Sequence, residues 1–152
     1  MTNAIPTLKI KKLVEDAIVP EIKTEGSVGF DLAAVSNYSI LPTNITDRAV
    51  MVRTGIAIEL PKGHYATMHL RSSAGKNSKL RLANQTGIID TDYRGEVIIL
   101  VENVGRYAQS ISKGDRIAQL VIHKKAPVNV VVSEELTETT RGANGFGSTG
   151  TN

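Results

Sequence analysis

The chain contains no cysteine and no tryptophan among its 152 residues, and aromatic residues make up only 4%. Without cysteine, disulfide frameworks, thiolate catalysis, zinc–cysteine sites and iron–sulfur clusters are all excluded. The shortage of aromatics leaves isoleucine, valine, leucine and alanine to build the core, and the β-branched members of that set favour strands. No apolar run approaches the roughly 20 residues that a membrane-spanning helix needs. The first residues also lack the basic and apolar regions of a signal peptide. We therefore expect a cytoplasmic protein with no membrane partner.

The excess of positive over negative charge is small. The chain has 18 Lys and Arg against 15 Asp and Glu, which gives a net charge of +3. This surplus is too small to predict nucleic-acid binding, although it would not repel an anionic substrate. The overall composition, 41% hydrophobic and 22% charged, is that of an ordinary globular protein, and the length suits one domain.

What the sequence does contain is a series of short apolar stretches separated by Gly, Pro and Asn turns. Such a series predicts an antiparallel sandwich or barrel. The expected strands are residues 8–14, 50–52, 56–60, 64–70, 96–103, 116–123 and 128–132, with one short helix-like stretch at residues 72–77. Residues 97–101 are apolar on both faces, which predicts that one face lies in the core and the other against a second sheet or subunit.

The last residues differ in character from the rest. From Thr139 onward the chain is rich in Gly, Ser, Thr and Asn and has no aliphatic side chain larger than alanine, so it cannot supply a core. We expect a domain over residues 1–138 and an arm over residues 139–152 that is mobile when unbound. A disordered terminus is the simplest interpretation of the arm. However, a lone Phe146 among glycines suits stacking on a base, and Arg141 could pair with phosphates.

A turn between two apolar strands holds the richest cluster of polar groups. Asp90, Asp92, Tyr93 and Arg94 all lie between Gly87 and Gly95. The spacing alone favours a solvated β-turn in which Asp makes local hydrogen bonds. The functional alternative makes one Asp a general base and Tyr93 a wall of a pocket.

Three further stretches are ambiguous when each is taken alone. Arg71, Ser72 and Ser73 come at a strand end and suit an anion, but they lack the spacing of a phosphate-binding loop. Residues 29–34 could equally be the start of a strand, and Gln119 faces opposite to its neighbours in an otherwise apolar strand. The three histidines are scattered and predict no metal site, and no nucleophile elbow is present.

Taken together and in order, these elements resemble the five motifs of the trimeric dUTPase family, from about residue 26 to residue 150. Residues 29–32 resemble the first motif, residues 71–73 the second, residues 87–95 the third, residues 116–120 the fourth and residues 141–150 the fifth. The third and fifth are long and unusual, so they carry most of the resemblance.

The resemblance implies an all-β, jelly-roll-like β-barrel that assembles as a homotrimer with active sites at the subunit interfaces. It also implies hydrolysis of dUTP to dUMP and pyrophosphate by Mg²⁺-assisted, in-line attack of water on the α-phosphate, a reaction that needs positioning and charge neutralisation. Asp90 would be the general base. Asp31 would bind Mg²⁺ through water.

The same resemblance assigns the substrate contacts position by position. Asn84 would hydrogen-bond uracil with help from the backbone of Gly87, Ile88 and Ile89, and Tyr93 would pack under the deoxyribose. Phosphate contacts would come from Arg71, Ser72, Ser73 and Gln119 in the barrel and from Arg141, Gly147, Ser148 and Thr149 in the arm, with Phe146 over the uracil.

The sequence departs from the family pattern in the second motif, where Ser73 and Ala74 replace the usual Gly and Leu, and Ser73 adds a side chain close to the phosphates. Two alternatives stay open. A dCTP deaminase shares this fold but uses a Glu within the strand at residues 97–101, where all five positions here are aliphatic. A non-catalytic, nucleotide-binding regulatory barrel would not need to keep Asp31, Asp90, Tyr93, Gln119 and the entire arm together.

Overall fold

The computed structural model describes residues 5–145, which contain ten strands and one short helix. The strands are β1 (Lys9–Lys12), β2 (Gly29–Ala33), β3 (Tyr38–Ile40), β4 (Val50–Glu59), β5 (His64–Leu70), β6 (Leu80–Leu82), β7 (Gly87–Ile89), β8 (Glu96–Asn103), β9 (Gln109–Ile111) and β10 (Arg116–Lys124), and the helix α1 spans Ser72–Asn77. The predicted all-β class is therefore confirmed.

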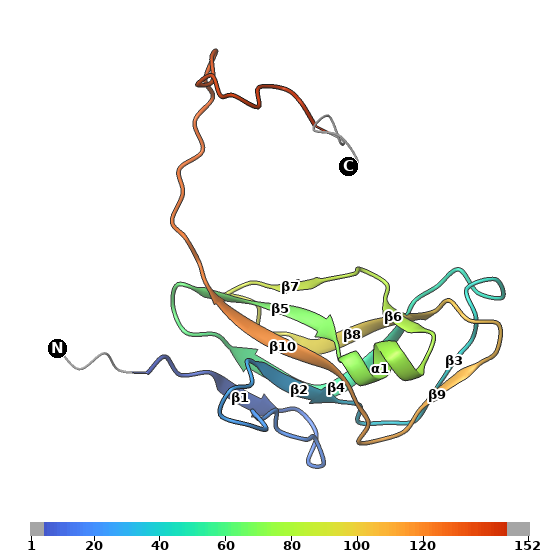
Figure 1. Ribbon diagram of the computed structural model, residues 1–152. Coiled ribbons are helices and arrows are strands. Elements are labelled where there is room, and N and C mark those ends of the chain that lie inside the picture. The colour runs from blue at the N-terminus through green and yellow to red at the C-terminus, as the bar shows by residue number, and fades with distance from the viewer. Residues whose placement is uncertain (1–4, 146–152) are drawn as a thin grey trace.

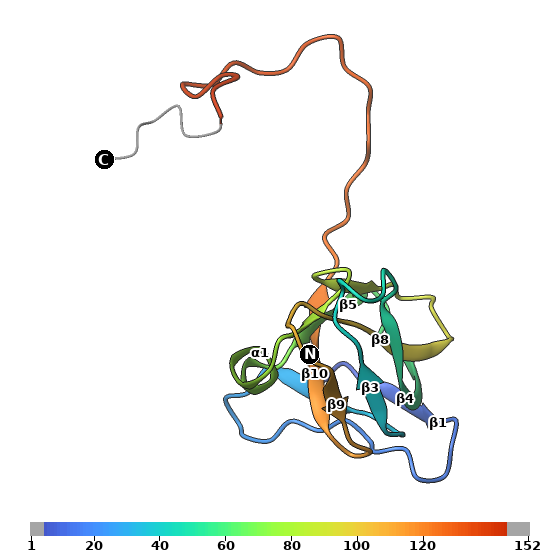
Figure 2. The same ribbon diagram turned by 90° about the vertical axis from the view of Figure 1, so that its right-hand side faces the viewer.

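Two four-stranded antiparallel sheets form the body of the molecule (Figure 1). Their strand orders are β1-β4-β8-β6 and β2-β10-β5-β7, and a small third sheet pairs β3 with β9. Within residues 5–145 these ladders remain separate sheets, so the jelly-roll-like barrel takes the form of a sandwich. Figure 2 shows the two layers from the side, with α1 at one margin.

The core lies between the sheets and follows the alternation of the sequence. In β8 every second residue is buried, and Ile99 and Val101 are fully so. In β5 the buried pair is Ala66 and Met68. These residues belong to one apolar cluster with Leu120 of β10, which places the contact between the sheets at the centre of the fold.

Strand β4 is continuous, although the sequence predicts two strands separated by residues 53–55. The register with β8 shifts between Arg53 and Ala57, which marks a bulge. Gly55 lies in the bulge with φ of +70°, a conformation that L side chains rarely adopt. The break in the apolar pattern at residues 53–55 therefore corresponds to a bulge and not to the end of a strand.

The predicted strand at residues 128–132 is wrong. After β10 ends at Lys124, the described chain runs away from both sheets (Figures 1 and 2). Val128, Val130, Val131 and Val132 are between 79% and 97% exposed. High β-propensity alone does not make a strand when no neighbouring strand is available to pair with it.

Candidate functional site

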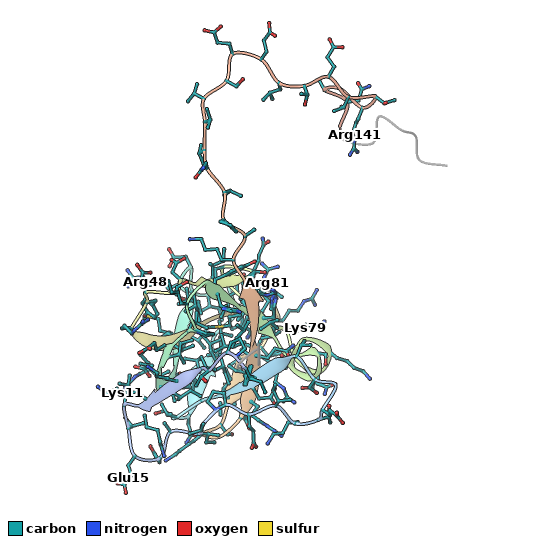
Figure 3. All side chains as sticks on the ribbon, turned by 90° about the vertical axis from the view of Figure 1, so that its left-hand side faces the viewer. Lys11, Glu15, Arg48, Lys79, Arg81 and Arg141 are labelled. Atoms are coloured by element: carbon teal, nitrogen blue, oxygen red, sulfur yellow. The ribbon has the colours of Figure 1, made fainter. Side chains whose placement is uncertain are left out.

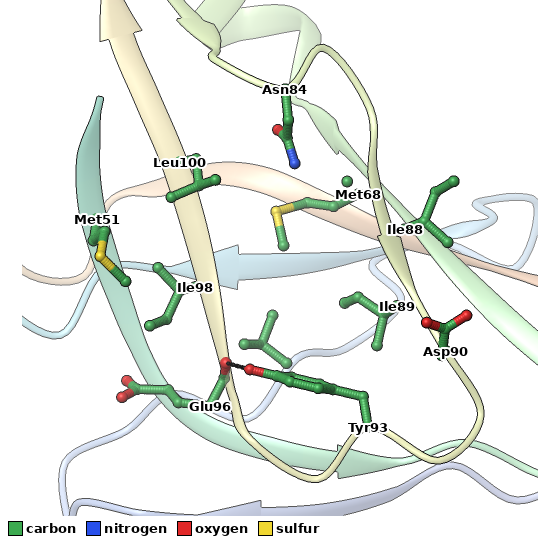
Figure 4. A pocket seen from close by; sticks show the side chains of 12 residues that line it. Met51, Met68, Asn84, Ile88, Ile89, Asp90, Tyr93, Glu96, Ile98 and Leu100 are labelled. Carbon is green, nitrogen blue, oxygen red and sulfur yellow. Dashed lines mark hydrogen bonds between the residues drawn. The ribbon is translucent and has the colours of Figure 1, made fainter. Parts of the chain in front are cut away.

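A cavity of about 290 Å³ opens between β7 and β8, on the flank of the sandwich (Figure 4). Its lining combines residues of β4, β5, β7 and β8 with the loop before β7 and the turn after it. The lining residues are Met51, Met68, Asn84, Gly87, Ile88, Ile89, Asp90, Tyr93, Glu96, Val97, Ile98 and Leu100. The walls are mostly apolar and the polar groups are few, which is typical of a small-molecule site. Six residues predicted as site residues meet here.

Asn84 lies in the loop between β6 and β7, at one end of the cavity (Figure 4). The next residue, Gln85, has φ of +59°, and among the described residues it is the one non-glycine residue with positive φ. Gly87 makes room for the amide, because a Cβ there would lie 3.1 Å from Met68 Cβ and 3.4 Å from Asn84 Nδ2. The local backbone therefore holds Asn84 against the start of β7.

The turn from Asp90 to Arg94 closes the opposite end. The Tyr93 amide donates to the Asp90 carbonyl at 3.2 Å, and the Arg94 guanidinium donates to the carbonyls of Thr91 at 2.8 Å and Tyr93 at 2.9 Å. The Thr91 hydroxyl donates to the His64 carbonyl, which ties the turn to β5. The turn is thus held by its own side chains, and the Asp90 carboxylate remains exposed.

Asp90 borders two hollows. It lines the base of the main cavity, and it also lines a second hollow with Tyr65, Thr91, Asp92 and Lys125. Lys125 is the first residue after β10 and therefore begins the segment that leads to the arm. A carboxylate at this boundary can reach a group that projects from the cavity toward solvent.

Sequence reasoning missed most of the apolar wall. Met51 comes from β4, Met68 from β5, and Ile98 and Leu100 from β8. These residues belong to three different strands and meet only through the folding of the sheets, so no local motif marks them. The one available signal was the second apolar face of β8, which the sequence analysis assigned to packing.

A second group of predicted residues gathers at the other side of the sheet β2-β10-β5-β7. Gln119 of β10 pairs with Asp31 of β2 and with His69 of β5, so these three side chains share one face. Asp31, Arg71, Ser72 and Gln119 line a common hollow with Lys23, Gly26, Ser27, Val28 and Gly29. A Cβ at Gly29 would collide with the Gln119 amide, so glycine lets this side chain lie flat over β2.

Arg71 is anchored by three contacts. Its Nε lies 2.9 Å from Asp31 Oδ1, its Nη1 donates to the Arg116 carbonyl at 3.0 Å, and its amide donates to the Ile117 carbonyl at 2.9 Å. Arg116 Nη1 is 3.4 Å from Asp31 Oδ2, an ion-pair distance without hydrogen-bond geometry. Two guanidinium groups therefore flank one carboxylate that is only 10% exposed, and one of its oxygens retains acceptor capacity.

Ser72 and Ser73 are the first two residues of α1, and both are exposed. The predicted helix-like stretch has the same bounds as the helix in the structure, Ser72–Asn77. Ser73 lines a hollow with Arg71 and Arg116 that lies next to the Asp31 hollow. Its additional side chain thus lies beside Arg71 and Arg116, which together with Asp31 and Gln119 form a group called here the basic cluster.

Arg141 does not reach either group in a single chain. Figure 3 shows it on the described part of the arm, well away from the body. Phe146, Gly147, Ser148 and Thr149 lie outside the described residues. The predicted residues of the body therefore line three hollows, namely the main cavity, the Asp31 hollow and the Ser73 hollow, of which the last two share Arg71, and Arg141 lies apart.

Within residues 5–145, no cluster of three or more His, Cys, Asp or Glu is arranged to hold a metal ion. Two histidines do meet, since Nε2 of His69 and of His123 each lie 2.8 Å from the Thr67 hydroxyl. The one helix of the described chain is too short to cross a bilayer.

The sequence profile of the dUTPase family matches residues 15–150. The chain belongs to the dUTPase family. It is 42% identical over 143 residues to the deoxyuridine 5'-triphosphate nucleotidohydrolase of Hydrogenobaculum, covering 94% of this chain and 97% of that protein. The corresponding Helicobacter pylori P12 protein is 38% identical and shares 94% and 96% of the two chains.

Solved dUTPases have the same fold. The Staphylococcus bacteriophage 80alpha dUTPase with dUpNHpp superposes with a TM-score of 0.86 at 26% identity, covering 95% of this chain and 99% of that one. The dUTPase of phage phi11 of S. aureus, in which coordination of a structural Mg(II) ion was described, superposes with a TM-score of 0.75 at 23% identity, covering 85% and 97%. For the present dUTPase, the cavity and the basic cluster are the structural counterparts of the motifs found in the sequence.

Proposed function

We propose that this dUTPase hydrolyses dUTP to dUMP and pyrophosphate by attack of water on the α-phosphorus, and that the cavity between β7 and β8 holds the deoxyuridine. The observation that carries the proposal is the arrangement of Asn84, the β7 backbone, Tyr93 and Asp90 around one cavity. The names of the curated relatives and the nucleotide analogue bound by the phage 80alpha enzyme point to the same substrate.

The β7 backbone supplies the recognition of the base. β7 is the last strand of its sheet and pairs only with β5 in the described chain, so every second N–H and C=O group points outward. Uracil carries an N–H flanked by two carbonyls, which matches such an edge. The Asn84 amide completes the match, and cytosine is rejected because its amino group would leave a buried donor or acceptor unpaired.

Tyr93 supplies the floor under the sugar. Its ring is 45% exposed within the cavity, and its hydroxyl donates to the Glu96 carbonyl at 3.0 Å, so the ring edge is fixed. A flat aromatic surface packs against the C2′ side of a deoxyribose. A ribose 2′-hydroxyl would collide with it.

Asp90 is the general base in this proposal. Its exposed carboxylate accepts a proton from water as the water oxygen bonds to the α-phosphorus. The bond between the α-phosphorus and its bridging oxygen breaks in line with the attack, and that oxygen leaves with pyrophosphate. No covalent enzyme intermediate is required.

The basic cluster holds the phosphates. Arg71 is pre-positioned by Asp31, and Gln119, Ser72 and Ser73 present polar groups beside it. Pre-positioned donors cost little reorganisation when charge moves during the reaction. Arg141, Gly147, Ser148 and Thr149 of the arm would add further contacts once the arm closes, with Phe146 over the base.

The donor set fits a magnesium ion that is held mainly by substrate and water. Mg²⁺ retains several waters and needs only one or two protein carboxylates. Asp31 has one oxygen paired with Arg71, while Oδ2 is buried 3.4 Å from Arg116 Nη1 and has no hydrogen-bond partner in the described structure, so this oxygen would be the one to accept from a water of the ion when the site opens to substrate. The bound ion would neutralise charge on the phosphates.

We further propose that three copies assemble and share their sites. In one chain the main cavity and the hollow beside Arg71 are separate, and the described part of the arm contacts neither of them. Exposed apolar side chains also surround the cavity, with Met51 57% and Ile88 70% exposed. The unpaired valines of residues 128–132 provide a strand that a neighbouring sheet could take up.

A deaminase role has no support at the corresponding position. The β8 residues that line the cavity after Glu96 are Val97, Ile98 and Leu100, none of which can move a proton. The Glu96 carboxylate is tied to Arg53 and to the Gly55 amide.

The test is incubation of the purified protein with Mg²⁺ and each of dUTP, dCTP, dTTP and UTP, with products separated by ion-exchange chromatography. We expect dUMP and pyrophosphate from dUTP, little reaction with the others, and loss of activity with EDTA. Absence of dUMP would refute the proposal, and ammonia from dCTP would favour the deaminase. Light scattering should report three chains.

A further inference from the structure

The Tyr93 ring owes its position to the two residues that follow the turn. A Cβ at Gly95 would lie 2.6 Å from Tyr93 Cζ and 3.0 Å from Cε2, so only glycine allows the ring to fold back over the chain. The hydroxyl then donates to the carbonyl of Glu96 at 3.0 Å, as Figure 4 shows. The ring is therefore located by the backbone of the first residue of β8.

The Glu96 side chain extends in the opposite direction from Tyr93, toward β4 (Figure 4). Its Oε1 accepts from the Gly55 amide at 2.8 Å, and its Oε2 lies 3.0 Å from Arg53 Nε, which is also 3.3 Å from Oε1. The Glu96 side chain is only 14% exposed. Hydrogen bonds to a charged, partly buried acceptor are the strong ones.

These contacts fall on the bulge of β4, where the sheet ladder is interrupted. Opposite β8, residues 54–56 occupy the space between the pairs Arg53–Ile98 and Ala57–Glu96. Other side chains satisfy the remaining backbone groups, since the Tyr38 hydroxyl accepts from the Arg53 amide at 2.9 Å and the Thr54 hydroxyl donates to the Val97 carbonyl at 2.5 Å. Glu96 thus replaces the missing ladder bond at the point where β8 enters the cavity.

The bulge is closely packed against neighbouring parts of the chain. A Cβ at Gly55 would lie 2.6 Å from Val14 Cγ2 and 2.8 Å from Val35 Cγ1, so the side chains of these two valines pack closely against the bulge. The Leu13 amide also donates to the Gly55 carbonyl at 2.8 Å. A carboxylate bound to this point is bound to a rigid part of the fold.

We propose that Glu96 is a positioning residue that sets discrimination between deoxyribose and ribose. Its carboxylate fixes the start of β8 on the β4 bulge, its carbonyl fixes the Tyr93 hydroxyl, and the Tyr93 ring excludes the 2′-hydroxyl. Removal of the carboxylate releases the chain at Glu96 and lets the ring move away. This inference rests on the proposed function, because it concerns the sugar of the same substrate.

The expected signature is a change in selectivity more than a change in rate. When the ring moves, dUTP loses some packing, whereas UTP loses the collision that excluded it. We expect Glu96→Ala to reduce the ratio of kcat/KM for dUTP to kcat/KM for UTP about tenfold, a typical scale for discrimination of one hydroxyl. Glu96→Gln keeps an acceptor for the Gly55 amide and should fall between Ala and the parent.

Glu102→Ala is the matched control. Glu102 lies in the same strand, and its Oε1 makes a cross-strand ion pair with Arg81 Nε at 2.7 Å, but it does not line the cavity. We expect Glu102→Ala to leave the selectivity ratio unchanged. An equal fall for both nucleotides in Glu96→Ala would mean that Glu96 is merely structural and would overturn the inference.

A second pair of variants covers the case in which Glu96→Ala fails to fold. Tyr93→Phe removes the hydroxyl that links the ring to Glu96, so Glu96→Gln should change the selectivity ratio in the parent but not in the Tyr93→Phe background. Equal effects in both backgrounds would overturn the inference. If the parent itself releases no dUMP, the proposed function fails, and that outcome is distinct from an unchanged ratio in an active enzyme.

Discussion

The cavity between β7 and β8 and the basic cluster around Arg71 are built in different ways. The cavity is lined within one chain by apolar residues of four strands, and its turn is held by Arg94 and Thr91. The basic cluster consists of a few charged side chains on one sheet face, and the arm that would cover it lies apart. If the proposed function holds, recognition of the nucleoside is preformed, whereas the phosphate environment has to be assembled.

Removal of the arm should separate the two halves most sharply. A chain that ends at Thr140 lacks Arg141 and everything after it, but it retains every strand of both sheets. We expect pyrophosphate release to fall by roughly a hundredfold or more, because closure both adds phosphate contacts and excludes water. The far-UV circular dichroism and the melting temperature should stay close to the parent values. Loss of the folded signal would instead assign the arm a structural role.

Asp90→Asn should disable the chemistry while sparing both halves. The amide has nearly the same shape but cannot take a proton, so kcat should fall on the order of a thousandfold. Binding of dUpNHpp, measured by calorimetry, should stay within a few-fold of the parent. Asp92→Asn serves as the control, since Asp92 is an exposed carboxylate in the same turn and does not line the main cavity. Normal turnover in Asp90→Asn would remove Asp90 from the mechanism.

Gly87→Ala should affect the cavity alone and more mildly. The new methyl group would press on Met68 and on the Asn84 amide, at 3.1 Å and 3.4 Å. We expect KM for dUTP to rise several-fold, roughly the effect of weakening one hydrogen bond, with kcat little changed. Gly63→Ala lies in open space at the β4–β5 turn and controls for the loss of a glycine, although its φ of +76° adds backbone strain. A lower kcat with unchanged KM in Gly87→Ala would contradict the assignment of this strand to binding.

The smallest expected effect lies outside both halves and concerns one contribution to the pH dependence of stability. Lys113 hydrogen-bonds Asp16 and lowers the pKa of that carboxyl from its ordinary value of 3.8. A lowered folded-state pKa stabilises the fold above 3.8, and this contribution disappears as the pH falls through the folded-state value. The pair is fully exposed to solvent, so the effect is small. Asp16→Asn should lower the melting temperature slightly at neutral pH and not well below pH 3.8, and activity at neutral pH should not change.

Much of the fold could be predicted because the alternation of residues is regular where the strands are long. The predicted strands His64–Leu70 and Glu96–Asn103 match β5 and β8. Three-residue strands such as Tyr38–Ile40 and Gln109–Ile111 are too short to show a period, and they form because each has the other as a partner. The converse error arose at residues 128–132, where the residue types favour a strand but no strand of residues 5–145 pairs with them.

The site residues also divide into those that the sequence predicts and those that it does not. Asp90, Tyr93 and Asn84 were predicted because they belong to or adjoin a contiguous motif, and the structure places all three on one cavity. Met51, Ile98 and Glu96 were missed because their role depends on the register between β4 and β8, which includes a bulge that the sequence does not announce. The roles of all these residues, and of those in the arm, remain predictions.

The segment that leads to the arm begins where the Lys125 amide donates to the Gly63 carbonyl at 2.7 Å, the last backbone hydrogen bond between the described chain and the sheets. Beyond it, residues 126–145 would span roughly 65 Å when fully extended, at about 3.3 Å per residue. A tether of that length spreads its far end over a large volume, so its effective concentration at a given hollow is low until part of the tether is docked. If a neighbouring copy provides the dock, specific activity becomes a function of protein concentration, and dilution alone would switch the enzyme off.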